Sequence, residues 1–198
     1  NCIELECAEG RVILDVGRPL DAPADARGLV PGTLDLARPM DAVLISHPHQ
    51  DHYGLLEELP AHWPVVCGAP TEALIRLTAR IFGDEPQREF RPWKTGSSNQ
   101  IGPFRVTPLL TDHSAFDAHM LLIEVEGKRV LYSGDFRTHG RKASLVQRLM
   151  ADPPKDLDVL LMEGTNLGSD KPCMSEADLE GDYVDLFSRD KARARAAR

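Results

Sequence analysis

His47-Pro48-His49-Gln50-Asp51-His52 is the stretch of this sequence that decides its fold and its chemistry. It follows residues 42–46, an apolar segment typical of a buried strand, and it precedes Gly54 and the apolar start of a helix. Since side chains alternate along an extended chain, the first two histidines of the run point the same way and can bind one metal ion together. Its aspartate and last histidine stand where the helix begins and can bind a second ion. The run therefore predicts two neighbouring metal sites.

Two plainer interpretations of the run are weaker. An exposed polar loop would not concentrate three of the chain's seven histidines within six residues. A single structural zinc would recruit cysteines and close its tetrahedron, but none of the four cysteines lies in the run. Without a paired spacing, the cysteines are expected to be small buried side chains of a reduced protein, with no functional role: Cys2, Cys7, Cys67 and Cys173.

Further ligands follow two later strands. His113 comes shortly after the apolar residues 104–110, and Asp135 comes shortly after residues 129–131. At these strand ends His113 would complete the imidazole set of the first metal, and Asp135, with its two carboxylate oxygens, could bridge both ions. Asp15 also ends a strand, where a buried carboxylate is better suited to orient a ligand histidine or the backbone.

The composition describes a single acidic domain. The chain has 198 residues, 42% of them hydrophobic, which is enough for one core. Its net charge is −8, and no stretch approaches the roughly 18 apolar residues that a membrane helix needs. With no secretory leader and no cysteine pairs, a cytoplasmic protein is expected. The acidity disfavours nonspecific nucleic-acid binding by the whole surface. Candidates for a local basic patch are Arg137, Arg141, Lys142 and residues 189–198, although a solvated face explains such charges better.

Strand and helix patterns alternate along the chain, which predicts the α/β class. The expected strands are residues 2–6, 12–16, 42–46, 65–67, 104–110, 119–125, 129–133 and 157–162, with residues 126–128 as a hairpin turn. The expected helices are residues 53–59, 71–82, 142–150 and 176–187. A Pro- and Gly-rich linker around residues 91–102 would join two β-rich halves, each ending in a helix, which is compatible with a two-sheet αββα sandwich.

Together these motifs resemble the metallo-β-lactamase superfamily. The resemblance rests on the HxHxDH run, His113, the segment ending at Asp135 and the Asp15-x-Gly segment, and it spans nearly the whole chain. It implies an αββα sandwich of two mixed β-sheets flanked by helices. Ser133-Gly-Asp-Phe, followed by a strand and Glu163, is most similar to the β-CASP RNA-processing nucleases, which include ribonuclease J and the polyadenylation endonuclease.

The resemblance implies a dinuclear hydrolase. The metal ligands would be His47, His49, Asp51, His52, His113 and Asp135. The two divalent ions would be zinc, although carboxylate bridging also admits manganese. A hydroxide bridging the ions would attack the substrate, because divalent ions lower the pKa of bound water towards neutrality.

One of the ligands and several neighbouring groups would assist the reaction. Asp51 would hold or orient the nucleophile, and Glu163 would be a second catalytic carboxylate. Asp15 and His139 would support the site from behind the ligands. Arg137 and His139 are also close enough in sequence to Asp135 to contact a substrate phosphate, although an ordinary polar loop explains them equally well.

One ligand of the family pattern is missing from the sequence. Members supply another histidine to the second metal well downstream of the Gly-Asp motif, and after Asp135 this chain has only His139, which is too close. In β-CASP proteins that histidine follows an inserted cap domain. Residues 1–188 are therefore expected to form an incomplete metallo-β-lactamase domain without the cap and the final strands, followed by a basic tail or linker at residues 189–198.

The leading hypothesis for function is a metal-dependent phosphodiesterase that cleaves RNA or single-stranded DNA and is weakly active as an isolated chain. An alternative is a small-molecule hydrolase of thioesters, lactones or β-lactams, which would close its own site with the later histidine that is lacking here. A third is a non-catalytic scaffold subunit of an RNA-processing complex, against which the intact HxHxDH run weighs. The expected partners are the nucleic acid and either a second copy or a processing-complex subunit, with no membrane.

Overall fold

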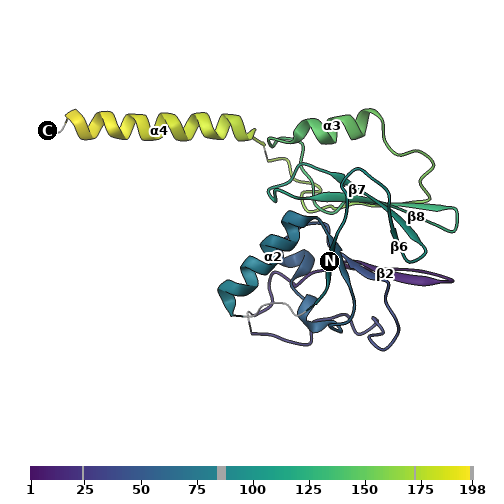
Figure 1. Ribbon diagram of the computed structural model, residues 1–198. Coiled ribbons are helices and arrows are strands. Elements are labelled where there is room, and N and C mark those ends of the chain that lie inside the picture. The colour runs from purple at the N-terminus through teal and green to yellow at the C-terminus, as the bar shows by residue number, and fades with distance from the viewer. Residues whose placement is uncertain (24, 84–87, 172, 197–198) are drawn as a thin grey trace.

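Two five-stranded sheets packed face to face form the centre of the protein (Figure 1). The computed structural model describes residues 1–23, 25–83, 88–171 and 173–196, with side chains as far as Arg189. The helix α3 lies on the outer side of one sheet and α2 on the outer side of the other (Figure 1), so the layers follow the order α, β, β, α. The predicted α/β sandwich is confirmed.

The N-terminal sheet has the strand order β1-β2-β3-β4-β5. Its strands are β1 (Cys2–Cys7), β2 (Gly10–Val16), β3 (Ala42–Leu44), β4 (Val65–Cys67) and β5 (Phe90–Pro92). The first two form an antiparallel pair, and β2 to β5 run parallel to one another. Because parallel strands end at the same edge of a sheet, the residues that follow β2 and β3 come together there.

The second sheet has the order β10-β9-β8-β7-β6. Its strands are β6 (Asn99–Ile101), β7 (Phe104–Leu110), β8 (His119–Val125), β9 (Lys128–Tyr132) and β10 (Val159–Leu161). The strands β6 to β9 form an antiparallel meander, and β10 lies parallel to β9. The strands β7, β9 and β10 therefore share one direction, and the residues that follow each of them lie at the same edge.

Alternation along β2 shows how the layers are held together. Val12 and Leu14 belong to the core between the two sheets, and Ile13 faces the opposite side, where it joins the core beneath α2 (Ala69–Phe82). All three side chains are fully buried. A strand buried on both faces reads as a continuous apolar run, as this one does.

The predicted helix over residues 53–59 is wrong. In its place the structure has the single helical turn α1 (Gln50–Tyr53) and the 3-10 turn η1 (Leu56–Glu58). Between them the backbone N–H of Leu55 donates to the carbonyl oxygen of Val16 at 3.0 Å, which ties this segment to the end of β2. A contact with a distant strand end therefore interrupts the helix that the local pattern favours.

The linker expected around residues 91–102 is also corrected. It contains the end of β5 and all of β6, two three-residue strands that form one edge of each sheet. Such short strands leave almost no periodicity to read in a sequence.

The helices α2 and α3 lie within a few residues of their predicted positions, and α4 begins where predicted. The helix α3 covers Ala143–Ala151 and buries Val146 against the second sheet. The helix α4 covers Glu176–Ala196, beyond the predicted end at residue 187, and projects away from both sheets (Figure 1). Among the described residues, no helix has both the length and the apolar content that crossing a membrane requires.

Candidate metal centre

The HxHxDH run lies at the edge where the two sheets meet. Ser46 and His47 follow β3 and are fully buried, and His49 stands immediately before α1 with an extended backbone. The loop between β7 and β8 brings His113 to the same place, and the loop after β9 brings Asp135. Three chain segments thus supply one group of side chains.

Three imidazoles form the first set of converging donors: His47, His49 and His113. Their ligand nitrogens all lie within 4.8 Å of one another. The Nδ1 atom of His49 is 3.1 Å from Nε2 of His47 and 3.1 Å from Nε2 of His113. This spacing fits nitrogens that share one ion.

The hydrogen bonds of Ser46 set the tautomer of His47. The Ser46 hydroxyl donates to Asp15 Oδ2 at 2.7 Å, so it accepts from His47 Nδ1 at 3.0 Å. With its proton on Nδ1, a neutral His47 presents a lone pair on Nε2, which faces the other two rings. The side chain is therefore oriented as a metal ligand must be.

Burial and neighbouring charges keep two of these imidazoles neutral. Burial and the neighbouring imidazoles lower the pKa of His47 to about 2. Burial and the adjacent His49 lower the pKa of His113 to about 4. Because imidazole binds metal only in its unprotonated form, both rings are ready for an ion at neutral pH.

The second set of converging donors is His47, His52 and Asp135. The Oδ1 atom of Asp135 lies 3.2 Å from His52 Nε2, and its Oδ2 atom lies 3.9 Å from His113 Nε2. The carboxylate of Asp135 therefore reaches both sets. The side-chain amide nitrogen of Asn1 also contacts His52 Nε2, at 3.0 Å.

Asp51 lies beside this second set without joining it. Its Oδ2 atom is 3.5 Å from His52 Nε2, and 28% of its side chain is exposed. The predicted ligand thus stands at the solvent side of the site, where its carboxylate can reach a substrate or a water molecule.

Asp15 holds the second set in place from behind. Its fully buried carboxylate accepts four hydrogen bonds, from Ser46 N–H, the Ser46 hydroxyl, the Tyr132 hydroxyl and His52 Nδ1–H, all between 2.6 and 2.7 Å. Burial opposes a charge on His52, but hydrogen bonds from its ring to Asp135 and Asp15 raise its pKa to about 9. A metal ion would replace the proton on Nε2, while Asp15 keeps the other side of the ring.

The donors present fit divalent ions. Three imidazole nitrogens, with protons directed away from the centre in the case of His47, converge with a carboxylate that reaches both sets. Imidazole and carboxylate suit zinc and also admit manganese. Side chains that could hold a divalent ion are therefore in place.

Glu163 is not one of the converging donors, but it contacts the residue that follows Asp135. Its Oε1 atom accepts from the backbone N–H of Phe136 at 2.6 Å, and its own N–H donates to the Ser133 hydroxyl at 3.0 Å. Both contacts fix the loop that carries Asp135. Glu163 thus supports the loop that carries Asp135.

His139 is not among the donors that the structure brings together. Its backbone carbonyl oxygen accepts from the N–H of Glu176 at 3.3 Å, at the start of α4. Arg137, beside it, pairs with Glu176 at 2.5 Å and with Asp112 at 3.4 Å.

The sequence reasoning missed Asp112. This fully buried carboxylate accepts from Gly140 N–H at 2.7 Å and Lys142 N–H at 3.3 Å, and it pairs with Arg137. It fixes the segment after Asp135 against the segment that carries His113. The only sequence signal was an acidic residue directly before a candidate ligand.

Gly17 allows the backbone of the run to come close to the end of β2. A Cβ atom at this position would lie 1.5 Å from the carbonyl oxygen of Asp51, a distance that no side chain can adopt. The Asp15-x-Gly segment therefore combines a carboxylate for His52 with a residue small enough to admit the metal-binding turn.

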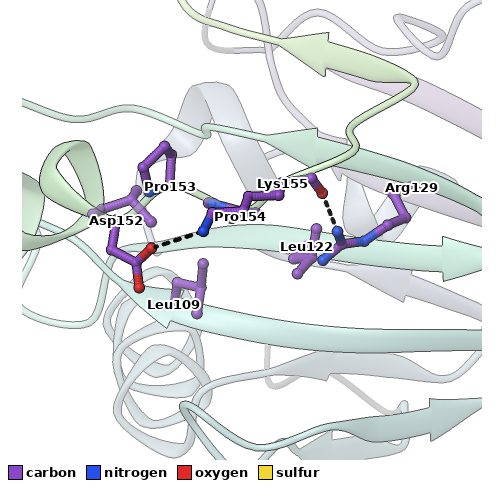
Figure 2. A pocket seen from close by; sticks show the side chains of 8 residues that line it. Leu109, Leu122, Arg129, Asp152, Pro153, Pro154 and Lys155 are labelled. Carbon is purple, nitrogen blue, oxygen red and sulfur yellow. Dashed lines mark hydrogen bonds and ion pairs between the residues drawn. The ribbon is translucent and has the colours of Figure 1, made fainter.

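A separate pocket lies on the outer face of the second sheet (Figure 2). Its volume is about 470 Å³, and Leu109 and Leu122 line it together with Leu149 of α3. Lys155 closes one side, with its ammonium 3.9 Å from Asp152 and its carbonyl oxygen bonded to Arg129. None of the converging metal donors lines it.

Comparison with known proteins gives one family and several nucleases. The model of the family described as the metallo-beta-lactamase superfamily matches residues 1–164. An RNase J-like protein of Methanocaldococcus jannaschii is 30% identical over 177 residues, which is 83% of this chain and 39% of the relative. A ribonuclease of Thermus thermophilus is 25% identical over 197 residues, covering 90% and 43%, and the 5′ exonuclease Apollo of Gallus gallus is 29% identical over 124 residues, covering 62% and 25%. The chain spans less than half the length of these relatives.

Solved structures show the same fold. A protein of unknown function from Enterococcus faecalis V583 superposes with a TM-score of 0.78 at 20% identity, over 95% of this chain and 54% of the other. MEM-A1, a subclass B3 metallo-beta-lactamase from a soil metagenome library, gives a TM-score of 0.53 at 20% identity, over 81% and 72%.

Proposed function

Because the chain belongs to the metallo-β-lactamase superfamily, we propose that it is a metal-dependent nuclease that hydrolyses phosphodiester bonds in RNA or single-stranded DNA. The observation that carries the proposal is the convergence of imidazole and carboxylate donors at one sheet edge. The names of its relatives, ribonucleases and a 5′ exonuclease, favour a nucleic acid as the substrate.

In this proposal the side chains divide into two binding sets. His47, His49 and His113 would hold one divalent ion. His52 would hold a second with Asp51 beside it, and the carboxylate of Asp135 stands near both sets. When bound, the ions supply charge that stabilises the phosphoryl group in the transition state and make a water molecule more acidic.

The protein's own groups then orient the reaction. The partly exposed carboxylate of Asp51 accepts a proton from the attacking water or fixes its direction. Asp15 keeps His52 in one orientation through its Nδ1–H, and Glu163 keeps the Asp135 loop in place through Phe136 N–H. Asp15 and Glu163 are positioning residues in this scheme.

The substrate and partners of the whole protein are part of the same proposal. A cytoplasmic location fits an RNA substrate, and binding to a second copy or to a processing-complex subunit is a prediction that follows from the resemblance.

Cleavage assays test the proposal directly. The zinc-loaded and manganese-loaded chain is incubated with end-labelled single-stranded RNA, single-stranded DNA, a thioester and a β-lactam. We expect cleavage of nucleic acid, abolished by a chelator. Asp51→Asn should lower kcat by about 100-fold or more, because positioned acid–base groups contribute at least that much, whereas the exposed Asp21→Asn should leave it unchanged.

Two results would contradict the proposal. One is hydrolysis of the thioester or the β-lactam with no cleavage of nucleic acid. The other is nuclease activity that Asp51→Asn leaves intact, since that activity would come from a contaminant or from a different site.

A further inference from the structure

The loop that carries His113 also carries an unusually exposed aromatic ring. Residues 111–118 leave β7 and return to β8, and the N–H of Thr111 donates to the carbonyl oxygen of Ala118 at 2.9 Å, which closes the loop. Within it, His113 turns inward to the metal donors, whereas the ring of Phe116 is 73% exposed. The folded chain leaves most of this apolar ring in contact with solvent.

The backbone on both sides of Phe116 is fixed. Ala115 and Asp117 are buried, at 7% and 6% exposure. The carboxylate of Asp117 accepts from the hydroxyl of Thr71 at 2.8 Å and from its backbone N–H at 3.1 Å, which attaches the loop to the first turn of α2. The exposed ring thus stands on a rigid support between two buried neighbours.

Lys142 fixes the loop from the other side. Its ammonium donates to the carbonyl oxygens of Ala115 at 3.2 Å and Phe116 at 2.7 Å, and it lies 5.9 Å from the centroid of the Phe116 ring. Its backbone N–H also contacts the carboxylate of Asp112, next to His113. A positive charge therefore accompanies the ring and links it to the metal-binding segment.

From this arrangement we infer that Phe116 is a base-stacking residue, whose ring binds a nucleobase of the strand that lies over the metal donors. The inference rests on the proposed nuclease function and adds a substrate contact to it. Phe116 is three positions after His113, so their Cα atoms are at most about 11 Å apart. A rigid, exposed aromatic beside a cation is what single-stranded nucleic acids bind, because every base has a face that can stack.

The surroundings of the ring favour a base over a protein partner. Ser114 is polar and exposed, and Ala115 is buried, so Phe116 has no exposed apolar neighbour within its loop. Protein interfaces generally need a larger contiguous apolar core. A single ring with a flanking ammonium matches one base and its attached phosphate more closely.

Binding measurements on metal-free protein test this contact apart from cleavage. Fluorescence anisotropy follows a labelled ten-nucleotide oligouridylate in the presence of a chelator. Phe116→Ala should raise the Kd by about 5- to 150-fold, the range that alanine substitution of a stacked aromatic gives. Phe116→Trp should retain the affinity. An oligomer of the same length with abasic sugars should bind wild type and Phe116→Ala equally.

Phe82→Ala is the matched control. Phe82 is 77% exposed and ends α2, a helix of 14 residues. At 1.5 Å per residue it lies roughly 17 Å along the helix from Thr71, which Asp117 contacts, so its removal should leave the Kd unchanged. Equal thermal unfolding temperatures of the variants would show that all of them fold.

The outcomes separate this inference from the nuclease proposal. Equal Kd values for wild type and Phe116→Ala, or an equal loss with the abasic oligomer, would overturn the stacking contact even if RNA is cleaved. Base-dependent binding through Phe116 in a chain that cleaves no nucleic acid would support the contact and refute the nuclease. A wild-type chain that neither binds RNA in this measurement nor cleaves it when loaded with metal would refute both.

Discussion

The backbone of Asp15 adopts a conformation that few residues accept. Its φ angle is 55°, in the left-handed region, where only glycine, asparagine and aspartate are at all common. The conformation turns the end of β2 so that one carboxylate can accept from Ser46, Tyr132 and His52 together. The local cost of this backbone conformation is offset by hydrogen bonds to a charged acceptor.

Asp15→Asn tests this arrangement. Asparagine tolerates the same backbone angle and has the same shape, but its amide group would direct N–H donors at groups that are themselves donors. We expect the free energy of unfolding to fall by about 3 kcal/mol, within the range for removing one partner of a buried charged hydrogen-bond network. Urea unfolding of the metal-free protein at neutral pH measures it.

The exposed Asp21→Asn serves as the control and should change the unfolding free energy by less than about 0.5 kcal/mol. If Asp15→Asn had the same urea midpoint as wild type, the carboxylate would not hold the site together.

The sequence predicts the proposed metal ligands better than it predicts the residues that hold those ligands in place. The six proposed ligands could be named because histidine and aspartate stand directly after apolar strands. Asp112 could not be recognised, because its partners, Gly140, Lys142 and Arg137, lie about thirty residues downstream and only the fold brings them near. Glu163 was named, but its contact with Phe136 N–H follows from the geometry of two parallel strand ends.

Helix α2 shows how one element depends on another. Gly68 precedes it and offers no side chain to bond the free N–H groups of the first turn. The carboxylate of Asp117, in the loop between β7 and β8 of the other sheet, accepts a hydrogen bond from Thr71 N–H instead. The helix therefore begins where a distant carboxylate permits, and the two sheets are joined through it.

Asp117→Ala should destabilise the protein by about 2 kcal/mol, because the loss of a helix-capping acceptor costs this much at the upper end of its range and the site is buried. Thermal and urea unfolding measure the change. Asp182→Ala, in the exposed part of α4, is the control with an expected change below about 0.5 kcal/mol. An unfolding free energy equal to that of wild type would mean that water caps α2 without loss.

Strands could be predicted where their pattern of apolar residues extended over many positions. The seven-residue strands β7 and β8 match the predicted ranges because their apolar residues repeat over their whole length. The strands β5 and β6 have three residues each and depend on neighbours for their hydrogen bonds, so no local signal specified them. The helix predicted after His52 is wrong because the backbone hydrogen bond from Leu55 N–H to the Val16 carbonyl oxygen joins distant residues and leaves no signal in the sequence.

At the scale of the whole molecule, the metal centre lies where the two sheets meet. The ends of β3, β7 and β9 contribute His47, His113 and Asp135, so the site exists only when both sheets are packed. Binding energy for a metal is then also folding energy, because an unfolded chain cannot hold these donors together.

Loading the metal-free protein with zinc should therefore raise its thermal unfolding temperature. A free zinc concentration 100 times the Kd adds about 2.7 kcal/mol, which corresponds to roughly 5–10 °C for a domain of this size. Differential scanning calorimetry with and without zinc measures the shift.

His113→Ala and His62→Ala form the matched pair for this measurement. The first removes a nitrogen of the first set and should cut the shift by at least half, whereas the second removes an exposed histidine and should keep it. An equal shift in both variants would place the zinc elsewhere on the protein.

The close approach of β2 to Asp51 sets a limit on how this sequence can vary. The Asp51 carbonyl oxygen occupies the space that any Cβ at position 17 would need, so only glycine fits there. In a library of every single substitution, selection for folded protein would return only glycine there, whereas the exposed position 116 would accept many residues until selection was made for binding RNA. The two positions would thus separate what the chain requires to fold from what it requires to act.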